Sequence, residues 1–231
     1  MRIIRNERHI RVFSFIGKYA TLAGLLTLLT GLIISFAKPE WLWPLLVSLT
    51  AGIGLSAVGG FLAERYVGAL AHHDALAKAL KGLDDDYALL QYVLPAPHVL
   101  VEPGGCTVFV VKAQGGEVAF DGKSERWRHR QRGKAFRQFA GQEALGAPDV
   151  EAKRRVEKLE NWLSDRLPEV EIPVRAAIVF VNPNVALDAD DSTIPTFYGK
   201  KVKGWLRGPG RLRQLPPDVY PQLTAALDMD T

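Results

Sequence analysis

Two long uncharged runs near the N-terminus constrain this chain more than any other feature of its 231 residues. Residues 19–37 and residues 41–63 contain no Asp, Glu, Lys or Arg. At about 1.5 Å per residue, helices of these lengths would reach about 28 and 34 Å, against a hydrocarbon core of about 30 Å. Only residues 38–40, Lys-Pro-Glu, separate the runs, so the second helix must return antiparallel to the first. We therefore predict a transmembrane helical hairpin over residues 19–63, which contacts the lipid bilayer.

Two other interpretations of the first run agree less well with its sequence. A cleaved signal peptide would have a shorter apolar stretch, followed by an A-x-A site that is missing here. A buried pair of soluble helices rarely has uncharged runs of this length. Aromatic residues also bracket the runs, as in the aromatic belts of membrane proteins: Trp41 and Trp43 begin the second run, and Tyr19 and Tyr66 are expected near the opposite membrane face.

The net charge of +4 resides entirely in the N-terminal part. Residues 1–63 contain six basic and two acidic residues, which leaves 23 basic and 23 acidic residues in the rest of the chain. The high pI therefore does not indicate a basic, nucleic-acid-binding domain. Five basic residues precede the first run, and Arg65, Lys78 and Lys81 follow the second. Because basic residues stay on the cytoplasmic side, we expect a multi-pass protein of the cell (inner) membrane with both termini in the cytoplasm.

Small residues recur on one face of each predicted span. Gly52, Ser56 and Gly60 repeat every four residues in the second span. The first span has a comparable face, formed by Ala20, Gly24, Gly31 and Ser35. Small residues let helix backbones approach closely in lipid, where packing drives association. These faces can join the two helices of one hairpin, or the face of the second span can join two protomers into a homo-oligomer.

After the hairpin, the hydrophobic pattern predicts an α/β domain with the order α-β-β-β-α-β. A helical lead-in from Glu64 is followed by a second helical stretch over residues 84–93, whose three opening aspartates complement the helix dipole. Three short strands joined by tight turns then form a meander, at residues 98–101, 107–112 and 117–120. A long amphipathic helix begins at Pro148, and the apolar run at 175–181 suits a buried central strand.

The chain thus divides into four predicted parts. These are a basic cytoplasmic segment (1–18), the hairpin (19–63), the α/β domain with its helical lead-in (64–213) and a Pro-containing tail (214–231). We expect the tail to be loosely ordered and to end in a short helix.

Several short motifs in the α/β domain occur in the order typical of one protein family. The motifs are Pro97-His98-Val99-Leu100-Val101, the turn Glu102-Pro103-Gly104-Gly105, Val110-Val111-Lys112 with Gly115-Gly116, Trp127, Pro148, and Phe180-Val181-Asn182. In this order, from about residue 79 to residue 207, the chain resembles the nuclease-related domain (NERD), a branch of the PD-(D/E)xK superfamily. The resemblance implies a restriction-endonuclease-like fold.

The chain departs from this family at its catalytic positions. In the superfamily an Asp and a Glu bind a divalent metal, usually magnesium, and a Lys orients or activates water near the scissile phosphate. Here Pro97 stands at the Asp position and Val110 at the Glu position; neither can bind metal, and only Lys112 remains. We therefore expect a catalytically inactive domain with no metal cofactor. The alternative is an active Mg-dependent nuclease with relocated carboxylates, from Glu102, Glu117 or the aspartates at 84–86.

Two basic clusters are candidate binding surfaces. The first, at residues 123–137, includes Arg126, Trp127, Arg128, Arg130, Arg132 and Lys134, and the second includes Lys200, Lys201, Lys203 and the nearby Trp205. Guanidinium and indole groups together suit a phosphate backbone with stackable bases. Anionic lipid headgroups are an equal candidate beside a bilayer, and a solvated surface paired with the domain's acids is the third. We expect a binding or scaffold module for nucleic acid, anionic lipid or a protein partner.

Other common catalytic and metal-binding patterns do not occur in the sequence. His72 and His73 are adjacent, so on a helix they point about 100° apart and cannot chelate one ion well. Cys106 is the single cysteine, which excludes an intrachain disulfide. There is no P-loop, no Gly-x-Ser-x-Gly and no Cys-x-x-Cys.

Overall fold

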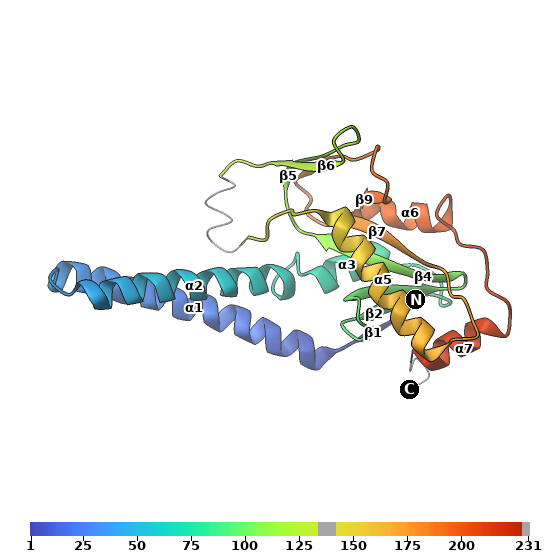
Figure 1. Ribbon diagram of the computed structural model, residues 1–231, viewed down its shortest axis with the longest axis horizontal. Helices are drawn as coiled ribbons and strands as arrows, with labels where there is room; N and C mark the ends of the chain where they lie inside the picture. The colour runs from blue at the N-terminus through green and yellow to red at the C-terminus, as the bar shows by residue number, and fades with distance from the viewer. Residues whose placement is uncertain (134–141, 228–231) are drawn as a thin grey trace. The chain divides into compact units, whose positions relative to one another are not determined.

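The computed structural model describes residues 1–133 and 142–227, and the chain divides into two compact units (Figure 1). One unit, the helical unit, comprises Glu7–His72 and Gln131–Ala144. The other, the sheet unit, comprises Met1–Asn6, His73–Arg130 and Leu145–Thr231.

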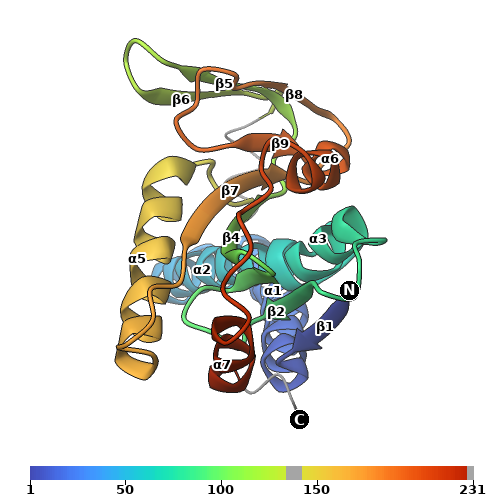
Figure 2. The same ribbon diagram turned by 90° about the vertical axis from the view of Figure 1, so that its right-hand side faces the viewer.

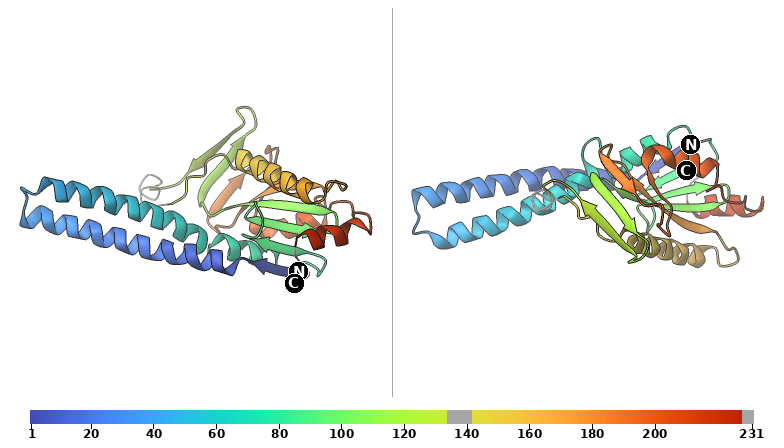
Figure 3. Two further views of the ribbon diagram at one scale, coloured as in Figure 1. Left: turned by 60° about the horizontal axis from the view of Figure 1, so that its bottom comes forward. Right: turned by 90° about the horizontal axis from the view of Figure 1, so that it is seen from above.

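The helical unit is built on two antiparallel helices, α1 (Glu7–Ala37) and α2 (Leu42–Tyr66), which lie side by side (Figure 3). Both are long and apolar enough to cross a membrane, as the uncharged runs predict. The first helix begins twelve residues before the predicted span, so residues 1–18 do not form one separate segment. At about 1.5 Å per residue, its 31 residues extend about 46 Å, well beyond a hydrocarbon core of about 30 Å.

Small residues line the contact between α1 and α2. Gly17, Gly24 and Gly31 are the glycines that α1 buries, and a Cβ on Gly24 would lie 2.6 Å from the backbone nitrogen of Ser56. From α2, Gly52 faces Leu28 and Gly59 faces Thr21. The small-residue face of α2 therefore packs inside the hairpin, with Gly59 rather than the predicted Gly60 buried in it.

The outer surface of the two helices is apolar. Leu22, Leu25, Leu29 and Ile33 on α1 each expose more than half of their surface, and so does Val47 on α2. Leucine on the outside and glycine on the inside is the pattern of a helix pair whose surroundings are as apolar as its side chains.

The sheet unit contains a mixed sheet of six strands with the order β1-β2-β3-β4-β7-β9. The strands are β1 (Arg2–Arg5), β2 (Ala88–Gln91), β3 (His98–Glu102), β4 (Gly105–Lys112), β7 (Val174–Phe180) and β9 (Thr196–Tyr198). β3 is antiparallel to β2 and to β4, whereas β7 runs parallel to β4 and to β9 and β1 runs parallel to β2. As predicted, β7 is an interior strand with a buried apolar end.

Helices cover both faces of this sheet (Figure 2). α5 (Pro148–Arg166) and α7 (Val219–Ala226) pack on one face, through Leu159, Leu163 and Leu223. α3 (His72–Leu80) and α6 (Val202–Arg207) pack on the other, through Leu76 and Leu206. The tail does end in a short helix, but the prediction that it is loosely ordered is wrong, because Leu223 is fully buried.

Two further predictions for this unit need correction. Residues 84–93 do not form a helix: the aspartates lie in a turn, and Ala88–Gln91 is strand β2, buried on both faces. The third strand of the predicted meander, β5 (Gly116–Asp121), leaves the large sheet. It forms a second sheet, in the order β6-β5-β8, with β6 (Arg126–Arg130) and β8 (Val185–Asp188).

Candidate functional site

Two of the three motif positions that the sequence singles out, Val110 and Lys112, lie two residues apart on β4, so their side chains leave the same face of the large sheet. The third, Pro97, lies in the bend just before β3, outside the paired residues of β3 and β4. α5 covers the face that carries Val110 and Lys112.

Lys112 is buried, with 3% of its side chain exposed, and its ammonium is held by a carboxylate of α5. The Nζ atom lies 2.8 Å from Oε2 of Glu151. The guanidinium of Arg155, one helical turn further on, binds the other oxygen of Glu151 and also donates to the backbone carbonyl of Phe109 over 3.3 Å. Two cations thus share one carboxylate, which compensates much of the desolvation penalty of burying Lys112.

Glu151 is the functional-site residue that sequence reasoning misses. It stands in the first turn of α5, where an acid is favoured by the helix dipole, and four residues before Arg155. That spacing is the signal that points to an ion pair on the helix. Its contact with Lys112 depends on how α5 packs on β4, which no local pattern reveals.

The acids that the sequence offers as replacement ligands lie elsewhere in the sheet unit. Glu102 is buried at the far end of β3, where it binds Arg175 and the hydroxyl of Thr107. Glu117 is exposed on β5. Asp84 lies 3.7 Å from Arg207, on the loop after α3.

The donor set beside Lys112 fits a divalent cation poorly. A hard cation such as Mg²⁺ needs several oxygen ligands, and Glu151 supplies one carboxylate that two cationic side chains already bind. Across residues 1–133 and 142–227, no group of three or more His, Cys, Asp or Glu side chains is positioned to hold a metal ion.

The first basic cluster forms a stripe of arginines on strand β6. Alternation along the strand turns Arg126, Arg128 and Arg130 outward, about 7 Å apart, and turns Trp127 and His129 inward. The indole of Trp127 donates to Oδ1 of Asp149 over 2.9 Å and its ring packs near Phe120 and Phe180, while His129 Nε2 lies 2.9 Å from the carbonyl of Gly115. Trp127 is therefore a packing residue, not a platform for base stacking.

Acidic side chains on β5 lie beside this arginine stripe. Arg128 forms an ion pair with Asp121, and the strand register places Glu117 opposite Arg130. The outward arginines of β6 are exposed, so their guanidinium groups can reach a phosphate oxygen, with Arg128 also bound to Asp121. Arg132 is exposed just beyond the strand. Lys134, the last predicted member of the cluster, lies outside the described residues.

The second basic cluster lies on a 3-10 turn, η1 (Gly199–Lys201), and on α6. Lys200 and Lys201 are exposed, whereas Lys203 donates to the backbone carbonyl of Lys81 over 2.7 Å. The guanidinium of Arg175 lies 4.3 Å from the ring centroid of Trp205, so this second tryptophan is engaged as well. Neither cluster offers its indole ring for stacking with a base.

Comparison with known protein families, with curated proteins and with solved structures finds no match for this chain.

Proposed function

We propose that this chain is a membrane-anchored binding module of the NERD type, with a restriction-endonuclease-like fold that has lost nuclease chemistry. The observation that carries the proposal is the ion-paired cluster of Lys112, Glu151 and Arg155. The motif lysine is neutralised by a helix carboxylate, and the motif's two acid positions are occupied by Pro97 and Val110, whose side chains have no metal-binding atoms. Phosphate recognition then falls to exposed arginines.

The hairpin α1–α2 supports the membrane anchor. Two spans return the chain to the side from which it started, and strand β1, which precedes α1, pairs with β2, which follows α2. Both ends of the hairpin must therefore reach the same compartment, as an even number of spans requires. The basic residues Arg8, Arg11 and Lys18 before the first uncharged run place that compartment in the cytoplasm, for a multi-pass protein of the cell (inner) membrane.

The β6 stripe is the proposed binding surface, and anionic lipid headgroups are its proposed ligand. Sequence-tolerant binding of single strands relies on aromatic stacking, which Trp127 and Trp205 do not offer because both are engaged in packing. Headgroup phosphates need cations alone, and each basic residue near an anionic leaflet contributes about 1 kcal/mol. The proposed membrane hairpin also tethers the sheet unit, which carries the stripe, to a bilayer.

Separate titrations with lipid and with DNA test this surface. The full-length protein in neutral-lipid nanodiscs is titrated with a fluorescent, water-soluble short-chain phosphatidylglycerol, and separately with labelled single-stranded and duplex DNA. We expect salt-sensitive lipid binding that falls at least fivefold when Arg126, Arg128 and Arg130 are all changed to Gln. The matched control changes Lys153, Arg154 and Lys158, three exposed cations of α5, to Gln. Tighter binding of DNA than of lipid, or equal effects of the two triple variants, would contradict the proposal.

The position of Glu151 favours a second candidate, a Mg-dependent nuclease with a relocated acid. Its carboxylate stands 2.8 Å from the motif lysine, on a helix instead of on the strand. This candidate predicts that Mg²⁺ raises the unfolding midpoint and supports cleavage that Lys112→Ala and Glu151→Gln abolish. Our proposal predicts no cleavage and no Mg²⁺-dependent shift.

A further inference from the structure

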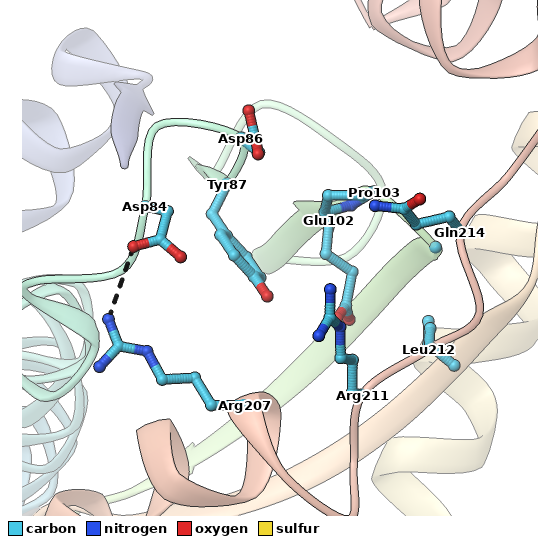
Figure 4. Close-up of a pocket in the computed structure, with 10 residues that line it drawn as sticks. Asp84, Asp86, Tyr87, Glu102, Pro103, Arg207, Arg211, Leu212 and Gln214 are labelled. Carbon is cyan, nitrogen blue, oxygen red and sulfur yellow. Dashed lines mark ion pairs between the residues drawn. The ribbon is translucent and has the colours of Figure 1, made fainter. Parts of the chain in front are cut away.

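A second polar site lies at the opposite end of β3, in a cavity of about 270 Å³ (Figure 4). Three parts of the sheet unit enclose it: the turn before β2, the β3–β4 turn and the segment that follows α6. Its charged and aromatic lining residues are Asp84, Asp86, Tyr87, Glu102, Arg207 and Arg211. It shares no residue with the Lys112 cluster or the β6 stripe, and it lies below the roughly 300 to 1,000 Å³ of drug-sized pockets.

The base of this cavity is a buried, fully bonded carboxylate. Glu102 is 2% exposed, and its oxygens accept hydrogen bonds from Nη2 of Arg175 over 2.9 and 3.2 Å. The hydroxyl of Thr107 donates to the same carboxylate and accepts from Nε of Arg175 over 2.8 Å. The raised pKa of Glu102, caused chiefly by burial, reflects the same enclosure. This network holds the floor of the cavity in one geometry.

The wall after α6 is held just as firmly. The guanidinium of Arg175 packs over the ring of Trp205, and Gly210 lies so close to that ring that a Cβ would collide with it. Arg207 donates to the backbone carbonyl of Gly82 and lies 3.7 Å from Asp84, which joins this wall to the opposite one. Arg211 is therefore presented from a fixed backbone, and its side chain is exposed.

The lining places opposite charges on opposite walls. Arg207 and Arg211 lie on one side and Asp84 and Asp86 on the other, while Glu102 is neutralised by Arg175. The aspartates would repel a phosphate, and the two arginines would repel a metal cation. A molecule that carries both an anionic and a cationic end satisfies both walls at once.

We propose that this cavity binds a small zwitterion of amino-acid size. Its carboxylate pairs with the guanidinium of Arg211, which is the arrangement that guanidinium geometry favours. Its ammonium pairs with Asp86, and the side chain of Tyr87 lines the space between the two ends (Figure 4). The cavity is a sensor site on the domain, independent of the phosphate-binding stripe.

The test uses the full-length protein in detergent micelles and a panel of free L-amino acids. Thermal unfolding and isothermal titration are repeated with propionate and with ethylamine, each of which carries one of the two charges. We expect at least one amino acid to raise the unfolding midpoint by about 3 °C or more at saturation, and neither half-molecule to do so.

Variants separate this site from a general charge effect. Arg211→Gln and Asp86→Asn should each weaken binding about tenfold, since each removes a charged hydrogen-bond partner. Arg213→Gln removes a charge two residues from Arg211, outside the lining, and should leave the affinity unchanged. The proposal is overturned if no amino acid binds, if propionate binds as tightly as the amino acids, or if Arg213→Gln weakens binding as much as Arg211→Gln.

Discussion

The helical unit and the sheet unit use the same residue types in opposite places. α1 and α2 bury Gly17, Gly24 and Gly52 against each other and expose leucines such as Leu29, which is 52% exposed. The sheet unit buries leucines completely, such as Leu159 between α5 and the sheet. The difference agrees with the proposal that the helical unit lies in lipid, since a helix pair in lipid buries small residues and exposes large apolar ones.

The comparison is sharpest for leucine. We expect Leu159→Ala to destabilise the sheet unit by about 2–5 kcal/mol, because it opens a cavity in a fully packed core. Leu29→Ala removes the same atoms from an outer helix surface and should change stability by less than about 0.5 kcal/mol. Denaturant unfolding of the full-length protein in detergent measures both. Similar effects at the two positions would break the comparison.

The next largest expected effect concerns a charge that the sheet unit buries. The sheet unit tolerates Lys112 inside because Glu151 binds it, so Glu151→Gln should lower stability by about 2–4 kcal/mol because it removes the carboxylate charge beside the buried ammonium. Glu157→Gln, at an exposed position of the same helix, is the matched control. Denaturant unfolding in detergent measures both variants. If Glu151→Gln lowered the stability no more than Glu157→Gln does, the cluster would contribute little to stability.

In the helical unit, glycine is expected to be essential where α1 and α2 touch and dispensable elsewhere on the same helices. Gly24→Leu places a side chain against Ser56 and should weaken the hairpin by about 1–3 kcal/mol. Gly54→Leu, on α2 where nothing lies within 4 Å of an added Cβ, should be tolerated. Disulfide crosslinking between cysteines placed on α1 and α2 reports the helix contact. Equal crosslinking in both variants would show that glycine is not needed there.

The smallest expected effect concerns the strand that precedes α1. Arg5 donates to Oε1 of Gln91 over 2.6 Å and lies 3.1 Å from Asp74. Arg5→Gln should therefore lower the stability of the sheet unit by about 1 kcal/mol, whereas Arg8→Gln, exposed on α1, should not. Hydrogen exchange of the β2 amides tests whether β1 is held at the sheet edge, and equal exchange in both variants would contradict that role.

The sequence predicts well what local patterns determine. The uncharged runs, the amphipathic helix from Pro148 and the apolar strand at 174–180 all carry their signal within one segment, and the structure has each of them. β2 is missed because three aspartates before it resemble a helix start, while its four residues are too few for a strand period. β1 is missed because its four residues are likewise too few to show a strand period.

The candidate site is predictable only in part. Lys112 is visible in the sequence, because it ends the apolar strand Gly105–Lys112. Glu151 is not, since its contact with Lys112 depends on the packing of α5 against β4. The inward turn of Trp127 follows from strand alternation once β6 is known to be a strand, and the basic run alone does not predict one.

Cysteine accessibility from the two sides of a membrane tests the central claim, that α1 and α2 form a membrane-spanning hairpin with both ends in the cytoplasm. Cys106 is fully buried, which raises its pKa to about 12, so the native chain is an unreactive background for single cysteines at Glu40, Arg8 and Asp165. In intact cells an impermeant maleimide should label Glu40→Cys alone, and in inverted membrane vesicles it should label Arg8→Cys and Asp165→Cys but not Glu40→Cys. Labelling of all three from the same side would contradict the account.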